Sequence, residues 1–274
     1  MARVIVVTSG KGGVGKTTTT SNLGMSLARL GHNTLLLDAD TGLRNLDLLL
    51  GLENRVFFTG SDVLNKKCKL EQAIIEDKRQ PKLSFFPLCS IHGSNPSIIG
   101  EEVEELISMV SNKYDFILID SPAGIDASFQ NAIRMANEAI IVVTPEVSSI
   151  RDADRVIGIL ITHGIKNNKL LINRIRPKMI RNDEMMSMKD IQNILGLPII
   201  GAIPESEQII IASNRGEPIV LEKKLSAVGM AFENTARRLE GQEVAFLDLG
   251  NIEAKNLVRR VLCKFLVKKP KEIK

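Results

Sequence analysis

The sequence predicts an α/β fold, with a doubly wound and mostly parallel sheet that carries helices on both faces. Short β-branched runs alternate along the chain with longer segments of helical period. Residues 4–7 and 116–119 are continuously apolar, which requires burial on both faces of the sheet. The composition, with 44% hydrophobic and 25% charged residues, is ordinary for a globular protein and excludes a disordered or fibrous chain.

Seven segments have the residue pattern of strands, and helix candidates of about 10 to 17 residues separate them. The predicted strands are residues 3–8, 34–37, 83–87, 116–119, 139–143, 169–172 and 199–203. Because no linker or repeat interrupts this pattern before about residue 240, we expect one domain over residues 1–240, a connector over 241–252 and a tail over 253–274. No segment approaches about 18 consecutive apolar residues and no leader precedes the first strand, so we expect a soluble protein.

A glycine-rich loop directly follows the first predicted strand. Residues 10–18 read GKGGVGKTT and fit the phosphate-loop pattern G-x-x-x-x-G-K-[ST]. Glycines let backbone N–H groups close around phosphate oxygens, and the following helix directs its positive end at them. Lys16 would neutralise phosphate charge and the Thr17 hydroxyl would bind Mg²⁺, which predicts an ATP site of the P-loop NTPase type. The expected nucleotide contacts are Gly10, Lys11, Gly12, Gly13, Val14, Gly15, Lys16, Thr17 and Thr18.

The same loop also satisfies a dinucleotide-binding pattern. Gly10, Gly12 and Gly15 fit G-x-G-x-x-G, and Asp38 ends the second strand, where such folds place an acid for the ribose. An NAD(P) enzyme, however, has no need of a lysine and a threonine at the phosphates, whereas a triphosphate with Mg²⁺ needs both. This favours ATP over a nicotinamide cofactor.

Further motifs extend the pattern along nearly the whole chain. The loop contains a second lysine, Lys11, and it is followed by DAD at residues 38–40, GLRNLD at 42–47, DSPAGI at 120–125 and PEVSSIRD at 145–152. On these residues the sequence resembles the MinD/ParA family of deviant Walker A ATPases, and within it the ATPases of division-site selection. The resemblance implies that ATP joins two copies of the chain into a homodimer.

The resemblance also implies roles for single residues. The expected catalytic residues are Lys11, Lys16, Asp40 and Asp120. Lys11 would reach across the dimer to the partner's phosphates, and Asp40 would orient the attacking water. The expected metal ligands are Thr17, Asp38 and Asp120, and Asn173 with Arg174 would hold the adenine. Glu146 and Asp152 would lie near the dimer interface, where regulators bind.

The cysteines narrow the choice within this family. Cys68, Cys89 and Cys263 show no C-x-x-C spacing, so the sequence lacks the paired ligands of an iron–sulfur carrier.

The charge is distributed unevenly along the chain. Residues 253–274 carry a net charge of +6, which leaves −2 on the rest of a chain whose total is +4. A mildly acidic body with a basic tail is unlike a uniformly basic DNA-binding protein.

The tail has the pattern of a basic amphipathic helix. Such a helix could dock on its own domain, bind nucleic acid or lie in a membrane interface. Large aliphatic side chains suit lipid better than phosphates, while the basic residues favour an anionic surface. The expected membrane contacts are Leu257, Val258, Arg260, Val261, Leu262, Lys264, Phe265 and Leu266.

Together these features predict an ATPase whose ATP-bound dimer docks on a membrane through its two tails. By resemblance, a MinC-like division inhibitor and a MinE-like activator are the expected partners, and no nucleic acid is expected. The expected location is the bacterial cytoplasm or the plastid stroma, on the inner (cytoplasmic or stromal) face of the membrane. The alternative is a DNA-partition ATPase of the same family, which would bind DNA as an ATP dimer.

Overall fold

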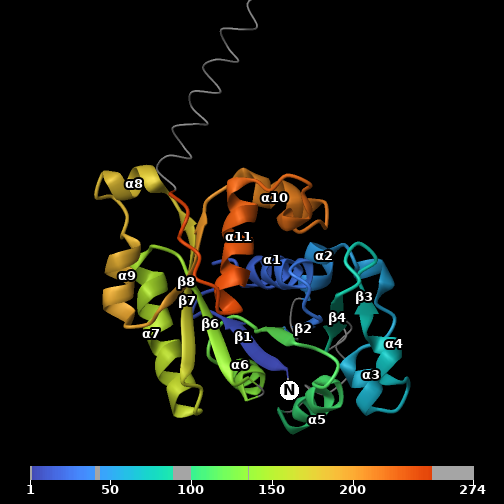
Figure 1. The fold of residues 1–274 in the computed structure, drawn as a ribbon. Coiled ribbons are helices and arrows are strands. Elements are labelled where there is room, and N and C mark those ends of the chain that lie inside the picture. The colour runs from blue at the N-terminus through green and yellow to red at the C-terminus, as the bar shows by residue number, and fades with distance from the viewer. Residues whose placement is uncertain (1, 41–43, 89–99, 135, 249–274) are drawn as a thin grey trace, which may run out of the picture.

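A computed structural model describes residues 2–40, 44–88, 100–134 and 136–248 of the chain. Its centre is an eight-stranded sheet in the order β3-β4-β2-β5-β1-β6-β7-β8 (Figure 1). Neighbouring strands run parallel except β3, which pairs antiparallel with β4. This confirms the predicted doubly wound, mostly parallel sheet.

The strands agree closely with the predicted segments. They are β1 Arg3–Thr8, β2 Thr34–Asp38, β3 Ile75–Glu76, β4 Leu83–Pro87, β5 Phe116–Asp120, β6 Glu138–Val143, β7 Asn167–Ile175 and β8 Ile199–Pro204. The sequence pattern missed β3, because two residues are too few to show an alternation. In the pairing of β2 with β5, Asp38 lies opposite Asp120. Two acids therefore meet at the carboxyl edge of the sheet.

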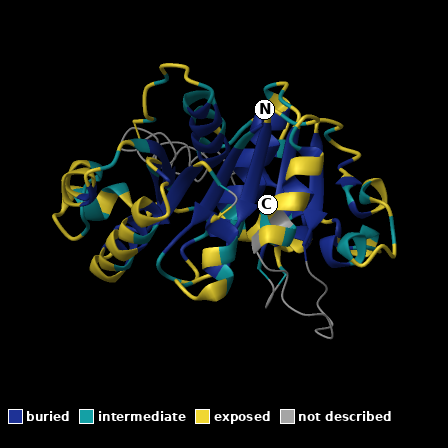
Figure 2. Cartoon of the chain, turned by 90° about the horizontal axis from the view of Figure 1, so that it is seen from below, coloured by how far each residue is buried: buried dark blue, intermediate teal, exposed yellow. Residues whose placement is uncertain are grey.

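Helices cover both faces of the sheet. They are α1 Lys16–Arg29, α2 Leu46–Leu50, α3 Gly60–Leu64, α4 Leu70–Ala73, α5 Gly100–Val110, α6 Ala127–Ile133, α7 Val147–Thr162, α8 Pro177–Arg181, α9 Met188–Leu195, α10 Glu207–Asn214 and α11 Ala227–Leu239, with short 3₁₀ turns η1 Glu53–Arg55 and η2 Ile219–Leu221. The alternating residues of β1 explain the two layers. Val4 and Val6 belong to the core under α5, α6, α7 and α9, while Ile5 and Val7 belong to the core under α1, α2 and α11. Figure 2 shows the buried sheet between the partly exposed helices.

The C-terminal part of the chain follows α11. Residues 241–248 of the predicted connector form no helix or strand. The predicted tail over residues 253–274, with its membrane contacts from Leu257 to Leu266, lies outside the described residues. Among the helices of the described ranges, none has the length and apolar character needed to cross a membrane.

Candidate functional site

The phosphate loop connects β1 to α1 at the carboxyl edge of the sheet. Its shape depends on two glycines at which any larger residue would be strained or would clash. Gly15 has a φ of 99°, and a Cβ atom there would lie 2.4 Å from the Asn173 side-chain nitrogen. A Cβ atom at Gly10 would lie 2.4 Å from the backbone carbonyl of Asp152. The loop is therefore packed closely between β7 and α7, with the N-terminus of the 14-residue helix α1 at its end.

Asn173 and Arg174, near the end of β7, form hydrogen bonds to the backbone of the phosphate loop. The Asn173 amide donates to the Val14 carbonyl at 2.8 Å, and the Arg174 guanidinium donates to the Gly13 carbonyl at 2.8 Å. Arg174 itself adopts a left-handed backbone conformation, with a φ of 57°. The structure thus brings both predicted adenine residues to the loop, where they bind its backbone. Their contact with adenine stays a prediction.

Lys16, Thr17 and Asp120 come together directly beneath the loop. The Asp120 side chain is buried and accepts a hydrogen bond from the Thr20 hydroxyl at 3.0 Å. Burial raises the pKa of Asp120 to about 6, although a hydrogen bond from Thr17 and the charge of Lys16 act in the opposite direction. Burial likewise lowers the pKa of Lys16, which the charges of Asp120 and Asp40 partly offset. A buried cation and a buried carboxylate therefore stabilise each other in the nucleotide-free site.

This arrangement fits a magnesium ion that is shared with a nucleotide. The described residues contain no group of three or more His, Cys, Asp or Glu side chains that could hold a metal ion by themselves. In phosphate sites, Mg²⁺ is usually held by one or two protein oxygens together with phosphate and water. The hydroxyl of Thr17 and the carboxylate of Asp120 form such a pair, since they are linked by a hydrogen bond.

Asp38 binds the backbone of the loop that follows β2. It is buried, and its two carboxylate oxygens accept hydrogen bonds from the backbone N–H groups of Asp40 at 3.0 Å and Leu46 at 3.3 Å. Burial and the nearby Asp120 raise the pKa of Asp38 well above its ordinary value. Asp38 thus holds the backbone that carries the half-buried Asp40. Its predicted role as a metal ligand stays a prediction.

The side chain of Lys11 contacts residues at the start of α7. Its Nζ atom lies 3.1 Å from the Glu146 carboxylate and 3.2 Å from the Ser148 hydroxyl, at the start of α7. The side chains of Lys11 and Glu146 are 42% and 53% exposed. Both residues of this ion pair are therefore accessible to another molecule.

Sequence reasoning missed two functional neighbours. Thr20 contacts Asp120, and the signal was available because Thr20 lies one helical turn after Lys16 on α1. Glu146 was noticed only as a residue near an interface. Its contact with Lys11 spans 135 positions, and no local pattern reports such a pair.

Comparisons with known proteins agree with this geometry. Residues 5–219 match the CobQ/CobB/MinD/ParA nucleotide binding domain. The chain is 58% identical to the putative septum site-determining protein MinD of Emiliania huxleyi, over 98% of each chain. It is 54% identical to the septum site-determining protein MinD of a Synechocystis strain, over 90% of this chain and 93% of that one.

Solved structures give the same result. The chain matches the MinC:MinD cell division protein complex of Aquifex aeolicus with a TM-score of 0.83 and 48% identity, over 90% of this chain and 99% of that chain. It matches MinD of Pyrococcus horikoshii, solved as a complex with Mg-ADP, with a TM-score of 0.79 and 32% identity, over 88% and 97% of the two chains.

The fold and the loop first define a class: the chain is a nucleotide-binding ATPase of the CobQ/CobB/MinD/ParA type and acts with Mg²⁺. Within the class, the chain belongs to the MinD family of septum site-determining proteins.

Proposed function

We propose that the chain is the ATP-driven membrane switch of a division-site selection system. ATP joins two copies, the paired tails bind an anionic membrane, a division inhibitor is recruited, and hydrolysis returns the chain to solution. One observation carries this proposal above the others. Lys11 belongs to the phosphate loop, and its partly exposed side chain pairs with Glu146 at the start of α7, so its charge is accessible to the nucleotide of a second copy.

The phosphate site supports a division of labour among its residues. Lys16 balances the charge of the β- and γ-phosphates, and Thr17 and Asp120 hold Mg²⁺, which withdraws charge from the phosphates when bound. Asp40 orients the attacking water beside Lys16. The charges of Asp40 and Lys16 already interact, since Asp40 acts to raise the pKa of Lys16. Lys11 of the partner subunit stabilises the charge of the transition state, as an arginine finger does. Hydrolysis then requires the dimer.

The tail provides the membrane step. Each tail of residues 253–274, whose sequence predicts an amphipathic helix, would bind an anionic surface weakly, since the pattern combines one apolar face with a few basic side chains. Two tails on one dimer bind far more tightly than one, because the second binds at the effective concentration set by the first. The nucleotide state therefore controls the membrane state.

The similar solved structures support one of the expected partners. The Aquifex aeolicus structure is a MinC:MinD complex, which supports a MinC-like inhibitor as the partner of the ATP dimer. A MinE-like activator would bind at the dimer interface and trigger hydrolysis. The chain would work in a bacterial cytoplasm or a plastid stroma, at the inner face of the membrane. A ParA family ATPase of Chlorobium tepidum, at 23% identity, shares the fold alone and does not favour a DNA-partition role.

A co-sedimentation assay tests the proposal. The full chain is mixed with anionic phospholipid vesicles, zwitterionic vesicles or duplex DNA, each with ATP or ADP. The proposal predicts ATP-dependent binding to anionic vesicles alone, and a loss of about ten-fold or more in Leu262→Glu, which places a charge on the apolar face. ATP-dependent binding to DNA without binding to lipid would contradict it and support the partition ATPase.

A further inference from the structure

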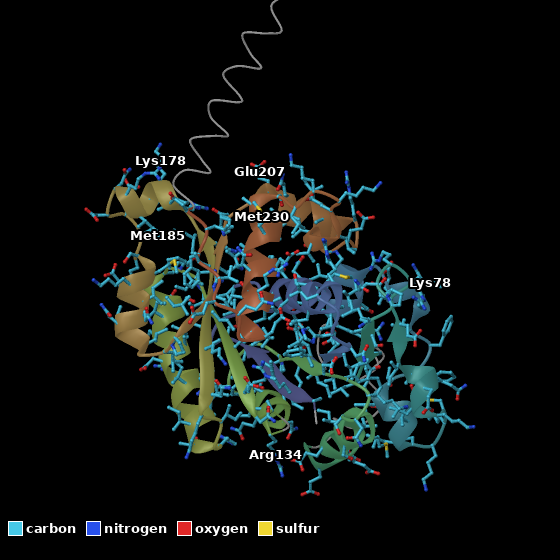
Figure 3. The ribbon with its side chains drawn as sticks, in the orientation of Figure 1. Lys78, Arg134, Lys178, Met185, Glu207 and Met230 are labelled. Carbon is cyan, nitrogen blue, oxygen red and sulfur yellow. The ribbon has the colours of Figure 1, made fainter. Side chains whose placement is uncertain are left out.

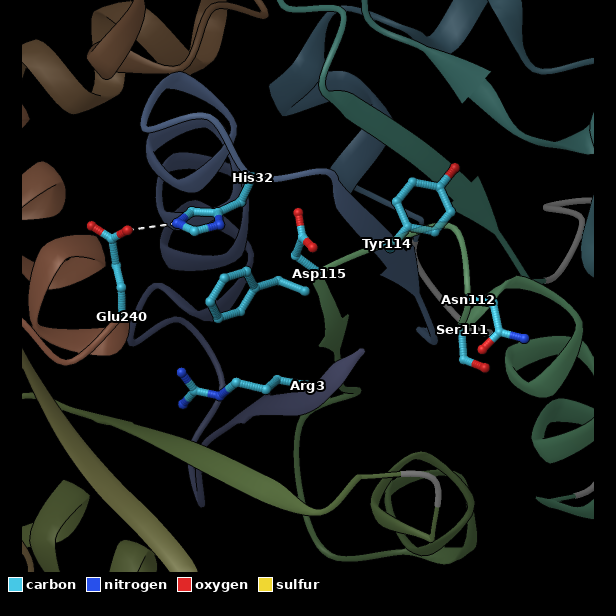
Figure 4. A pocket seen from close by; sticks show the side chains of 8 residues that line it. Arg3, His32, Ser111, Asn112, Tyr114, Asp115 and Glu240 are labelled. Carbon is cyan, nitrogen blue, oxygen red and sulfur yellow. Dashed lines mark hydrogen bonds and ion pairs between the residues drawn. The ribbon is translucent and has the colours of Figure 1, made fainter. Parts of the chain in front are cut away.

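Helix α11 ends at the edge of the sheet that lies opposite the phosphate loop. The Leu239 carbonyl accepts a hydrogen bond from Arg3 at 2.6 Å, and Glu240 pairs with His32 at 2.5 Å. Arg3 begins β1 and His32 lies two residues before the start of β2, so both mark the amino edge of the sheet. Figure 4 shows the shallow cavity of about 490 Å³ at this edge, with Glu240 facing His32. The chain after Glu240 therefore starts on the side remote from the nucleotide.

Residues 241–248, here called the strap, return along the body of the protein. In Figure 1 the strap rises from the lower end of α11 toward α8. In Figure 3, Lys178 of α8 and Glu207 of α10 lie at this same upper edge, and Arg134 lies at the opposite one. Eight residues reach about 26 Å when extended, which exceeds the roughly 20 Å length of the six-residue strand β8. The strap is long enough to carry the chain back to the carboxyl edge.

One arginine fastens the strap to the edge of the sheet. Arg238, in the last turn of α11, donates to the carbonyls of Val244 at 2.7 Å and Ala245 at 2.8 Å. Its third nitrogen donates to the carbonyl of Ile200 in β8 at 3.0 Å. The guanidinium also lies over the ring of Phe246, 4.0 Å from its centre. One side chain thus ties α11, the edge strand and the strap together.

These contacts use the properties that distinguish arginine from lysine. A planar guanidinium presents donors in fixed directions and stacks on an aromatic ring, whereas an ammonium group does neither. The hydrogen-bonded groups are backbone carbonyls, and the side chain of Phe246 adds the ring contact. Leu247 adds a packing contact with the core on the α1 and α11 face. The strap is attached at several adjacent points along its length.

We propose that Arg238 is a positioning residue for the membrane-binding tail. By fastening the strap it makes the tail leave the body from the carboxyl edge, where the nucleotide and the second subunit bind, and keeps the tether to the tail short. This inference rests on the proposed function, because it concerns the presentation of the two tails by an ATP dimer. Arg238 lies far from the phosphates and takes no part in hydrolysis.

The size of the effect follows from the tether length. With the strap fastened, about 8 residues separate Asp248 from Leu257, and release of the strap lengthens this to about 16. Effective concentration falls roughly as the −3/2 power of tether length, so doubling the tether lowers it about three-fold. We expect Arg238→Ala to weaken the binding of the ATP-bound full chain to anionic vesicles by about this factor.

The test combines vesicle binding with amide hydrogen exchange. Arg238→Ala and Phe246→Ala are compared with Arg237→Ala, the neighbouring arginine, which pairs with Glu233 in α11 and whose guanidinium also donates a long hydrogen bond, at 3.5 Å, to the Gln242 side chain. The proposal predicts faster exchange of amides 242–248 and about three-fold weaker vesicle binding in Arg238→Ala, and smaller changes of the same kind in Phe246→Ala. Arg237→Ala should match the wild type, and ATP turnover without vesicles should be the same in all four proteins.

Each result has a separate meaning. If the wild type binds vesicles with ATP and Arg238→Ala binds equally well, the positioning role of Arg238 is wrong while the membrane switch stands. Unchanged exchange of the strap amides in Arg238→Ala would also overturn the inference. If the wild type shows no ATP-dependent vesicle binding, the proposed function fails and the strap has no tail to position. Arg238→Lys, which keeps the charge without the fork, should resemble Arg238→Ala.

Discussion

The Nζ atom of Lys11 lies 3.1 Å from the carboxylate of Glu146, at the first turn of α7 in the same chain. The lysine in this ion pair is the one that we propose acts on the nucleotide of the second subunit. Its two side chains are largely exposed, so the pair contributes only about 0.2–1 kcal/mol and can be exchanged for a phosphate. The contact is therefore weak enough for Lys11 to leave Glu146 and bind a phosphate of the second subunit.

Removal of the Glu146 carboxylate should free Lys11 to bind the nucleotide of the second subunit. In Glu146→Gln the ATP-dependent dimer should form up to about five-fold more tightly, because the competing ion pair is gone. Analytical ultracentrifugation with ATP measures the dimerisation constant. A Glu184→Gln variant, which changes an exposed acid far from Lys11 in the sequence, serves as the control. Weaker dimerisation in Glu146→Gln would mean that Glu146 contributes to the interface itself.

Asp40 should be needed for hydrolysis and not for binding. Asp40→Ala is expected to retain Mg²⁺-ATP affinity within a few-fold and to lose about 100-fold or more in turnover, because the water is no longer oriented. Single-turnover hydrolysis and nucleotide titration separate the two quantities. Turnover close to that of the wild type would remove Asp40 from the mechanism.

Asp120 should make the nucleotide-free protein less stable at high pH. Its pKa of about 6 in the folded state lies above the ordinary value of 3.8. The stability that it contributes is therefore fully present below about pH 3.8 and is lost as the pH rises through about 6. Asn does not ionise, so the free energy of unfolding of Asp120→Asn, relative to that of the wild type, should be higher at pH 8 than at pH 5, although the substitution leaves the buried Lys16 without its carboxylate.

Denaturant unfolding at the two pH values measures this difference. The same substitution should abolish the stabilisation that Mg²⁺-ATP gives to the wild type, because the metal loses its carboxylate. A pH-independent effect of Asp120→Asn on unfolding would show that the carboxylate is not held in a neutral form by burial.

Gly15 and Asn173 should show coupled effects. Gly15→Ala places a methyl group 2.4 Å from the Asn173 side-chain nitrogen and also strains a backbone at φ 99°, so we expect destabilisation by about 2 kcal/mol or more. Gly13→Ala is the matched control, since its φ is also positive, at 76°, but its side has open space. It should cost about 1 kcal/mol.

The double variant Gly15→Ala with Asn173→Ala relieves the clash and leaves the backbone strain. Its free energy of unfolding should therefore lie above the value expected from adding the two single effects, which a double-mutant cycle reports directly. Strict additivity would contradict the close contact between the loop and β7.

The sequence predicted the parts of this protein that local patterns encode. Seven strands, the phosphate loop and the acids at the ends of β2 and β5 follow from apolar runs and from residue spacing in short segments. The motifs also predicted the family. In contrast, β3 was missed because its two residues carry no pattern, and its pairing depends on β4.

Several contacts around the site were not predicted from the sequence. Both carboxylate oxygens of Asp38 bind the backbone of the following loop, and its expected role as a metal ligand stays a prediction. Asn173 and Arg174 were expected at the adenine, and they hold the carbonyls of Gly13 and Val14 about 160 positions away. Residues 241–248 were recognised as a connector, but the role of Arg238 in fastening them required the packing of α11 on β8. No local pattern reports such contacts.

The central claim is that Lys11 acts on the nucleotide of the partner subunit, and complementation tests it most directly. When each variant is measured alone with anionic vesicles, Lys11→Ala and Asp40→Ala should each lose ATP turnover by about 100-fold or more. In an equal mixture, half of the dimers contain one copy of each variant. In these, the Lys11→Ala subunit keeps its own Asp40 and receives Lys11 from its partner, so turnover should recover to about a quarter of the wild-type rate. A mixture that shows only the sum of the two inactive variants would contradict the account.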